Sequence, residues 1–179
     1  MAEAMRKLLV LFLISTAWVC HAFESGLTLT AAPGKFVTRV VANSSPHTSI
    51  RGRLTISESK STEAWPTAAY IGVQQDSTND SAQIFVLKNE GDDYLTVGYR
   101  IIIAGTVRKL LYLGTIDLGD SIETTIAFDA GKVSISINGK HVAEEQTLLN
   151  SAAPYIAVSS GTANFEFVVD DPEKVGSKT

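Results

Sequence analysis

Two arginines spaced one residue apart are the side chains in this sequence best suited to bind an anion. Polar and apolar residues alternate in the segment 50–56, so Arg51 and Arg53 share one face of an expected strand and the apolar side chains share the other. A guanidinium group binds a carboxylate through two parallel hydrogen bonds. The spacing therefore predicts either a site for an acidic ligand or the solvated face of an amphipathic strand.

Two further polar side chains could take part in the same chemistry. Gln75 ends an expected strand and could donate a hydrogen bond to a bound carboxylate, and Tyr155 is the best candidate for moving a proton. His47 and His141 fall at expected loop or turn positions, which makes a catalytic role for either one less favoured. Sheets also favour tyrosine on structural grounds, so core packing is the alternative interpretation of Tyr155.

Other chemistries lack the residues that they need. The sequence has no Cys/His cluster for zinc, no glycine-rich phosphate loop and no nucleophile elbow, and no strand carries the alternating carboxylates of a retaining glucanase. We therefore expect no metal site and no cofactor. The net charge of −4, without a cluster of Lys or Arg, argues against nucleic acid or an anionic membrane as a partner.

The segment 1–22 has the pattern of a cleavable signal peptide. Arg6 and Lys7 precede the apolar run 8–17, and Cys20 and Ala22 are small residues at the two positions that signal peptidase reads. The apolar run is shorter than the roughly 20 residues that a membrane-spanning helix needs. We therefore expect a secreted or periplasmic protein that makes no membrane contact after cleavage.

The expected mature chain is a single domain. Cleavage removes Cys20, which is the only cysteine, so stability must come from burial and not from a disulfide. We expect a β-sandwich domain over 23–170 and a disordered tail over 171–179, because the tail is rich in Pro, Gly, Lys and Ser. We expect this domain to be a monomer.

The pattern between 27 and 169 is typical of short strands separated by tight turns. The pairs 104–105, 130–131 and 138–139 supply residues that tolerate the positive φ of hairpin turns, and only 144–150 could form a brief helical turn. Many short strands with almost no helix predict an all-β sandwich of two antiparallel sheets. The expected strands cover 27–30, 36–41, 50–56, 68–75, 83–88, 94–103, 106–113, 122–128, 132–137, 155–159 and 164–169.

One stretch resembles a known family. The segment 112–122, Tyr-Leu-Gly-Thr-Ile-Asp-Leu-Gly-Asp-Ser-Ile, contains a Leu-Gly turn, and 132–140, Lys-Val-Ser-Ile-Ser-Ile-Asn-Gly-Lys, contains an Asn-Gly hairpin. This order resembles the second half of a concanavalin A-like jelly roll, most closely that of the alginate lyase family, polysaccharide lyase family seven. The resemblance implies a jelly roll whose concave sheet binds a polysaccharide.

The motifs of that family are only partly retained here. Its strands bear Arg-x-Glu-x-Arg, Gln-x-His and, near the C-terminus, Tyr-x-Lys followed by another tyrosine. In the first motif Arg51 is retained and Arg53 replaces the acid. Gln75 stands where the histidine is expected, and in the third motif Tyr155 is retained while Ala157 replaces the lysine. The resemblance thus implies a site from which most of the elimination chemistry has been lost.

Three functions remain open at this point. The first is an exported, non-catalytic carbohydrate-binding protein that binds an acidic glycan through Arg51, Arg53, Gln75 and Tyr155. The second is a divergent polysaccharide lyase that cleaves polyuronates by β-elimination, with Tyr155 as its catalytic proton carrier. The third is an exported structural or adhesion module whose loops bind a protein. The first two require the four side chains to lie on the same concave face.

Overall fold

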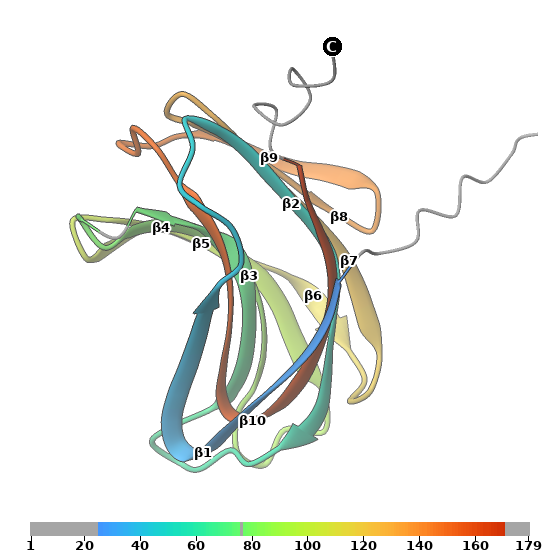
Figure 1. Cartoon of the computed structure of the whole chain (residues 1–179). Coiled ribbons are helices and arrows are strands. Elements are labelled where there is room, and N and C mark those ends of the chain that lie inside the picture. Colours follow the sequence, from blue (N-terminus) through green and yellow to red (C-terminus); the bar gives the residue numbers. More distant parts are fainter. Residues whose placement is uncertain (1–24, 76, 171–179) are drawn as a thin grey trace, which may run out of the picture.

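The computed structural model describes residues 25–75 and 77–170, and these fold into ten strands without a helix (Figure 1). Alternation of apolar and polar residues accounts for most of them. The strands are β1 Ser25–Val40, β2 His47–Ser59, β3 Thr67–Gln75, β4 Asp80–Lys88, β5 Leu95–Ile103, β6 Thr106–Ile116, β7 Ser121–Asp129, β8 Lys132–Ile137, β9 Lys140–Gln146 and β10 Ala153–Asp170.

Hydrogen bonding connects the strands in the order β6-β5-β4-β3-β10-β2-β7-β8-β9, and β1 pairs with β10. Every pairing is antiparallel. Strand β10 pairs with β3 through 153–159 and with β2 through 161–170, so it passes from one layer to the other. We call β6-β5-β4-β3 with 153–159 and 36–40 the first layer, and β2-β7-β8-β9 with 161–170 and 25–31 the second layer.

The two long strands bend where they change layers. In β10 the bend lies at Ser160, which has a φ of 46°, and at Gly161, where a Cβ would come within 2.5 Å of the Glu58 carbonyl oxygen. In β1 the register with β10 shifts between Ala31 and Phe36. The Gly34 N–H donates a hydrogen bond to Ser160 Oγ (2.9 Å), which ties the two bends together.

The core lies between the layers and consists of the inward-facing half of each strand. In β2 the buried residues Ile50, Leu54 and Ile56 face inward, and in β10 Ile156 and Val158 do so. Burying side chains of this size contributes about 1.5–3 kcal/mol each. With no disulfide among the described residues, this burial is what holds the layers together.

Three hairpin turns lie at the pairs that the sequence indicated. Ala104-Gly105, Ala130-Gly131 and Asn138-Gly139 join β5 to β6, β7 to β8 and β8 to β9, and both residues of each pair have positive φ. That is the backbone conformation of a two-residue turn that matches the twist of its strands. The jelly-roll sandwich of antiparallel sheets is therefore confirmed.

Two expectations about individual elements were wrong. The segment 144–150 does not begin with a helical turn, because Lys140–Gln146 is a strand paired with β8. The strands expected at 155–159 and 164–169 are one continuous strand, as are those at 27–30 and 36–41. The signal peptide over 1–22 and the tail over 171–179 lie outside the described residues. Within the described ranges, no helix is long and apolar enough to cross a membrane.

Candidate functional site: the outward face of the first layer

The two arginines expected to bind a ligand lie on the second layer and point away from the core. Their neighbours in β2, Ile50 and Leu54, face inward, so Arg51 and Arg53 face away from the core, and both are partly buried. Arg53 donates hydrogen bonds to Glu166 Oε2 (3.2 Å) and Glu123 Oε1 (3.3 Å), which lie directly opposite it on β10 and β7. The protein's own carboxylates therefore already pair with this guanidinium group.

Tyr155 and Gln75 belong to the first layer, but they differ in orientation. Tyr155 faces outward, since its neighbour Ile156 belongs to the core cluster and Tyr155 does not. Gln75 is the last residue of β3. Its side chain accepts a hydrogen bond from the Asn150 N–H (2.9 Å) and donates one to Ser77 Oγ (3.1 Å), so it holds loops at the end of the sandwich.

The four residues expected to form one site are therefore not brought together. Arg51 and Arg53 lie on the outer surface of one layer, and Tyr155 lies on the outer surface of the other. The physical reason is that the strands carrying them belong to different layers, which the sequence pattern does not specify. That Arg51, Arg53, Gln75 or Tyr155 binds a glycan on its own remains a prediction.

Cross-strand pairing places a different set of side chains beside Tyr155. Tyr155 lies opposite Gly72, Gly72 opposite Gln83, and Gln83 opposite Arg100. Because residues directly opposite each other share a face, the three side chains form one row across the outward face of the first layer. Gly72 has no side chain, and this lets the Tyr155 hydroxyl reach the Gln83 amide.

The Gln83 amide connects the two ends of that row. With its oxygen towards Arg100, the amide accepts a hydrogen bond from Nη2 (3.0 Å) and another from Nε, and its nitrogen donates to the Tyr155 hydroxyl. Gln83 and Tyr155 are both buried, although they face away from the core. A buried amide that satisfies both partners fixes the position of the guanidinium group.

Arg100 also contacts an aromatic ring. Its Cζ lies 4.9 Å from the centroid of the Tyr70 ring, a distance typical of a cation–π contact. Among the described residues, no carboxylate pairs with Arg100. The Arg100 guanidinium group is thus partly buried, contacts an aromatic ring and has no carboxylate partner among the described residues. Such a cation is suited to bind an anionic ligand.

Aromatic residues form the neighbouring row on the same face, where Tyr70 lies opposite Phe85 and both Phe85 and Tyr112 lie opposite Gly98. The Phe36 ring lies 5.8 Å from Tyr70, and the Phe85 ring makes an edge-on contact with Tyr112 at 6.0 Å between centroids. Phe36 and Tyr112 remain about half exposed, at 48% and 59%. The face thus offers exposed aromatic surface near a guanidinium group.

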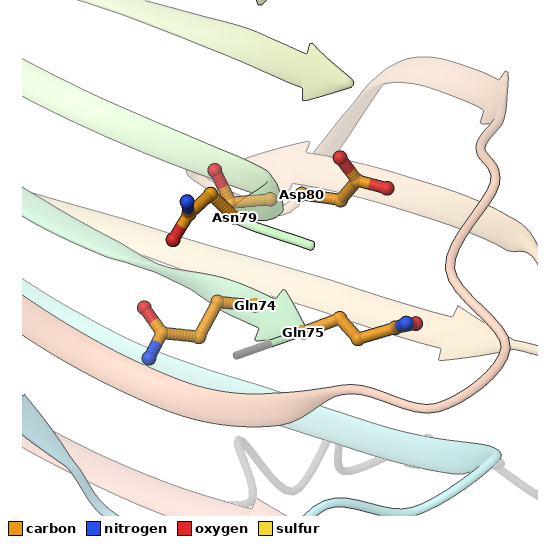
Figure 2. A pocket seen from close by; sticks show the side chains of 5 residues that line it. Gln74, Gln75, Asn79 and Asp80 are labelled. Atoms are coloured by element: carbon orange, nitrogen blue, oxygen red, sulfur yellow. The ribbon is translucent and has the colours of Figure 1, made fainter. Parts of the chain in front are cut away.

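A pocket of about 160 Å³ lies beside the Tyr155–Arg100 row, where β3 and β4 meet their hairpin. Figure 2 shows that Gln74 and Asn79 point to one side, while Gln75 and Asp80 point to the other. Gln74 and Ser81 lie opposite each other, two pairs beyond Gly72 and Gln83 and therefore on the same face. The side with Gln74 therefore continues the outward face with amide and hydroxyl groups.

Burial shifts the pKa values of the Tyr155 and Tyr70 hydroxyls. It raises the pKa of Tyr155 well above its ordinary value, and Arg100 only partly opposes this shift. Burial also raises the pKa of Tyr70. Both phenols therefore stay protonated near pH 7. Among the described residues, no group of three or more His, Cys, Asp or Glu could hold a metal ion.

Sequence reasoning missed Gln83 and Arg100, although both had a signal. In 95–101 the apolar residues Leu95, Val97 and Ile101 alternate, which puts Arg100 on the opposite face. In 82–86 the apolar residues Ala82, Ile84 and Val86 likewise alternate, which puts Gln83 on the face opposite to the core. The sequence analysis instead selected Gln75, which lies one strand earlier.

Comparison with known proteins supports the fold assignment. No protein-family model matches the sequence, and a search of curated proteins found no match. The carbohydrate-binding module CBM66 from Bacillus subtilis superposes with a TM-score of 0.57 and 10% identity, covering 80% of this chain and 86% of that one.

Two alginate lyases also have a similar structure at low sequence identity. The enzyme from Pseudomonas aeruginosa gives a TM-score of 0.55 at 18% identity, covering 69% of this chain and 64% of that one. The marine PL7 enzyme from Zobellia galactanivorans gives 0.51 at 11%, covering 70% and 62%. The chain thus spans less than two thirds of either lyase. It has the jelly-roll fold that alginate lyases and carbohydrate-binding modules share.

Proposed function

We propose that this chain is an exported, non-catalytic carbohydrate-binding protein that binds an acidic glycan on the outward face of its first layer. The observation that carries the proposal is Arg100, which no carboxylate among the described residues neutralises and which Gln83 and Tyr70 hold in place. A guanidinium group fixed in this way can bind the carboxylate of a uronic acid through two hydrogen bonds.

The aromatic residues supply the second half of the recognition. Sugar rings have apolar faces that pack against aromatic side chains, and Phe36 and Tyr112 expose such surface on the same face as Arg100. Polar groups at Gln74 and Ser81 extend the face towards the hairpin. The fold shared with a carbohydrate-binding module supports this use of the sandwich.

A binding role is favoured over catalysis because the described residues of this face supply no base. Elimination from a uronate needs a group that removes the proton next to the carboxylate. A tyrosine with its ordinary pKa of about 10 is protonated near pH 7, and burial raises the pKa of Tyr155 further. The histidines of the described residues, His47 and His141, lie on β2 and β9 of the other layer. The exported location rests on the expected signal peptide over 1–22.

Calorimetric titration with oligomers of uronic acids and with neutral oligosaccharides tests the proposal. We expect binding to a uronate oligomer, and Arg100→Ala should weaken it at least about tenfold, because a hydrogen bond to a charged group contributes about 1.5–3 kcal/mol. Arg51→Ala is the matched control and should leave the affinity unchanged. Absence of binding across the panel would refute the proposal. Weakening by Arg51→Ala alone would move the site to the second layer.

A further inference from the structure

Strand β6 is an edge strand with apolar side chains exposed on both faces. Among the described strands it pairs only with β5, so its other edge leaves backbone N–H and C=O groups unpaired. Val107, Leu110 and Tyr112 are 45–59% exposed, and Leu111 and Leu113 are 38–42% exposed. In a soluble protein such an edge is a template for pairing with another strand.

The other edges of the sandwich carry the usual protection against such pairing. Strand β9 contains Lys140, Glu144 and Glu145, and β1 contains Pro33 and a register shift. After Lys109, β6 has neither a charged residue nor a proline as far as Ile116. Charges, prolines and bulges are the means by which natural edge strands avoid association. The register of β6 with β5 shifts at Arg108 and at Leu113, and the segment 110–112 between these two shifts has no charge, proline or bulge.

We propose that β6 pairs with β6 of a second copy of this chain, which forms a two-fold dimer with continuous antiparallel strands. A second sandwich is the partner that fits, because the exposed leucines lie on both faces of the strand and a second copy of β6 presents the same two faces. In a two-fold dimer the same surface of each copy contacts the other, so the apolar face of one β6 meets the apolar face of its partner. An axis near Leu111 also places Arg108 of each copy opposite the uncharged segment 113–115 of the other, so like charges stay apart.

The charge on Lys109 does not oppose this pairing. Its ammonium group contacts the Glu145 carboxylate on β9 of the same chain, so the charge is already neutralised within each copy. No acidic residue lies on β6. The edge therefore presents mainly backbone groups and apolar side chains to a partner.

If the proposed glycan site is correct, the dimer joins two such sites. Strand β5 carries Arg100, and the two β5 strands would be three strand spacings apart, or about 14 Å. Their outward faces would then form one surface, along which a single polysaccharide could contact both guanidinium groups. This consequence rests on the proposed function, whereas the pairing itself does not.

Sedimentation of the purified chain without any glycan tests the pairing. At high micromolar concentration we expect the mass of a dimer. The double variant Leu110→Lys/Leu111→Lys should sediment as a monomer, because two charges at the edge oppose association. Leu148→Lys is the matched control, since Leu148 is 69% exposed and lies outside β6, and it should remain a dimer. A monomeric wild-type chain, or a dimeric double variant, would overturn the proposal.

A measurement on the wild-type chain covers the case in which the double variant does not fold. Amide hydrogen exchange over 107–113 should slow as the protein concentration rises, because pairing protects the edge amides. Exchange in β9 should not change with concentration. Equal rates in β6 at low and high concentration would contradict the pairing. Because no glycan is present, failure here leaves the proposed function untouched.

Discussion

Arg100 lies over the Tyr70 ring, 4.9 Å from Cζ to the ring centroid, although β4 separates the strands that carry them. The guanidinium group reaches the ring because it runs along the sheet surface, and the Gln83 amide holds it there. A flat, delocalised cation is suited to contact a ring on one side and a carboxylate at its edge. The proposed recognition of a carboxylate therefore depends on this residue being arginine.

Arg100→Lys should weaken uronate binding about five- to tenfold, even though the charge is kept. Lysine lacks the planar fork that binds a carboxylate through two hydrogen bonds, and it cannot keep the contact with Gln83 and Tyr70 together. Titration calorimetry with the same uronate oligomer measures the loss. Arg51→Lys on the other layer serves as the control. Equal affinity for wild type and Arg100→Lys would mean that the site needs only a positive charge.

Gly72→Ala should destabilise the sandwich by about 1–3 kcal/mol, the usual cost of overpacking. A Cβ at Gly72 would come within 2.5 Å of the Ala82 carbonyl oxygen and 2.8 Å of Gln83 Cβ. It would also occupy the space over which Tyr155 reaches Gln83. Gly26→Ala is the control, because no atom lies within 4 Å of its added Cβ. Urea unfolding compares the stability of the two variants. Equal midpoints would show that β3 and β4 accommodate the added Cβ of Gly72→Ala without a loss of stability.

The fold could be predicted from the sequence because its signals are local. Alternation in β2 and the positive-φ pairs such as Asn138-Gly139 depend on a few neighbouring residues, and both were interpreted correctly. The continuity of β10 could not be predicted in this way. Ser160 and Gly161 look like a break in the sequence, whereas in the fold they form a bend through which the strand changes layers.

The site was harder to predict because it depends on which strands become neighbours. Alternation correctly put Arg51 and Arg53 on one face, but it cannot say which layer that face belongs to. Glu123 and Glu166, the partners of Arg53, come from strands distant in sequence. Gln83 likewise meets Tyr155 across 72 residues of sequence. The missing information is the order of the strands in the sheet. Short sequence patterns do not reveal which distant strands become neighbours.

Alkaline conditions should destabilise the wild-type chain more than Tyr155→Phe. Burial raises the pKa of Tyr155 in the folded state, whereas in the unfolded chain a tyrosine has a pKa of about 10. Above about pH 10 the unfolded state therefore binds fewer protons than the folded state, and the free energy of unfolding falls as pH rises, by up to about 1.4 kcal/mol per pH unit for this residue. Below the pKa of tyrosine in the unfolded chain, about 10, Tyr155 is protonated in both states and does not lower the free energy of unfolding.

Urea unfolding from about pH 8 to about pH 11 measures this dependence. The alkaline decrease should be smaller in Tyr155→Phe, which has no hydroxyl to ionise. Tyr112→Phe removes the hydroxyl of an exposed tyrosine and is the control. Parallel curves for wild type and Tyr155→Phe would show that the Tyr155 phenol ionises as easily in the folded state as in the unfolded chain.

Incubation with polyuronates should yield no unsaturated product, although we propose that the chain binds them. Elimination needs a base beside the carboxylate that Arg100 is proposed to hold. The nearest phenols, Tyr70 and Tyr155, are both held neutral by burial, which raises the pKa of each. Ultraviolet absorbance of the unsaturated uronate measures turnover, and calorimetry on the same sample establishes that the glycan is bound. An absorbance increase that Tyr155→Phe abolishes and Arg51→Ala does not would instead identify a lyase that uses Tyr155, because binding alone cannot form a carbon–carbon double bond.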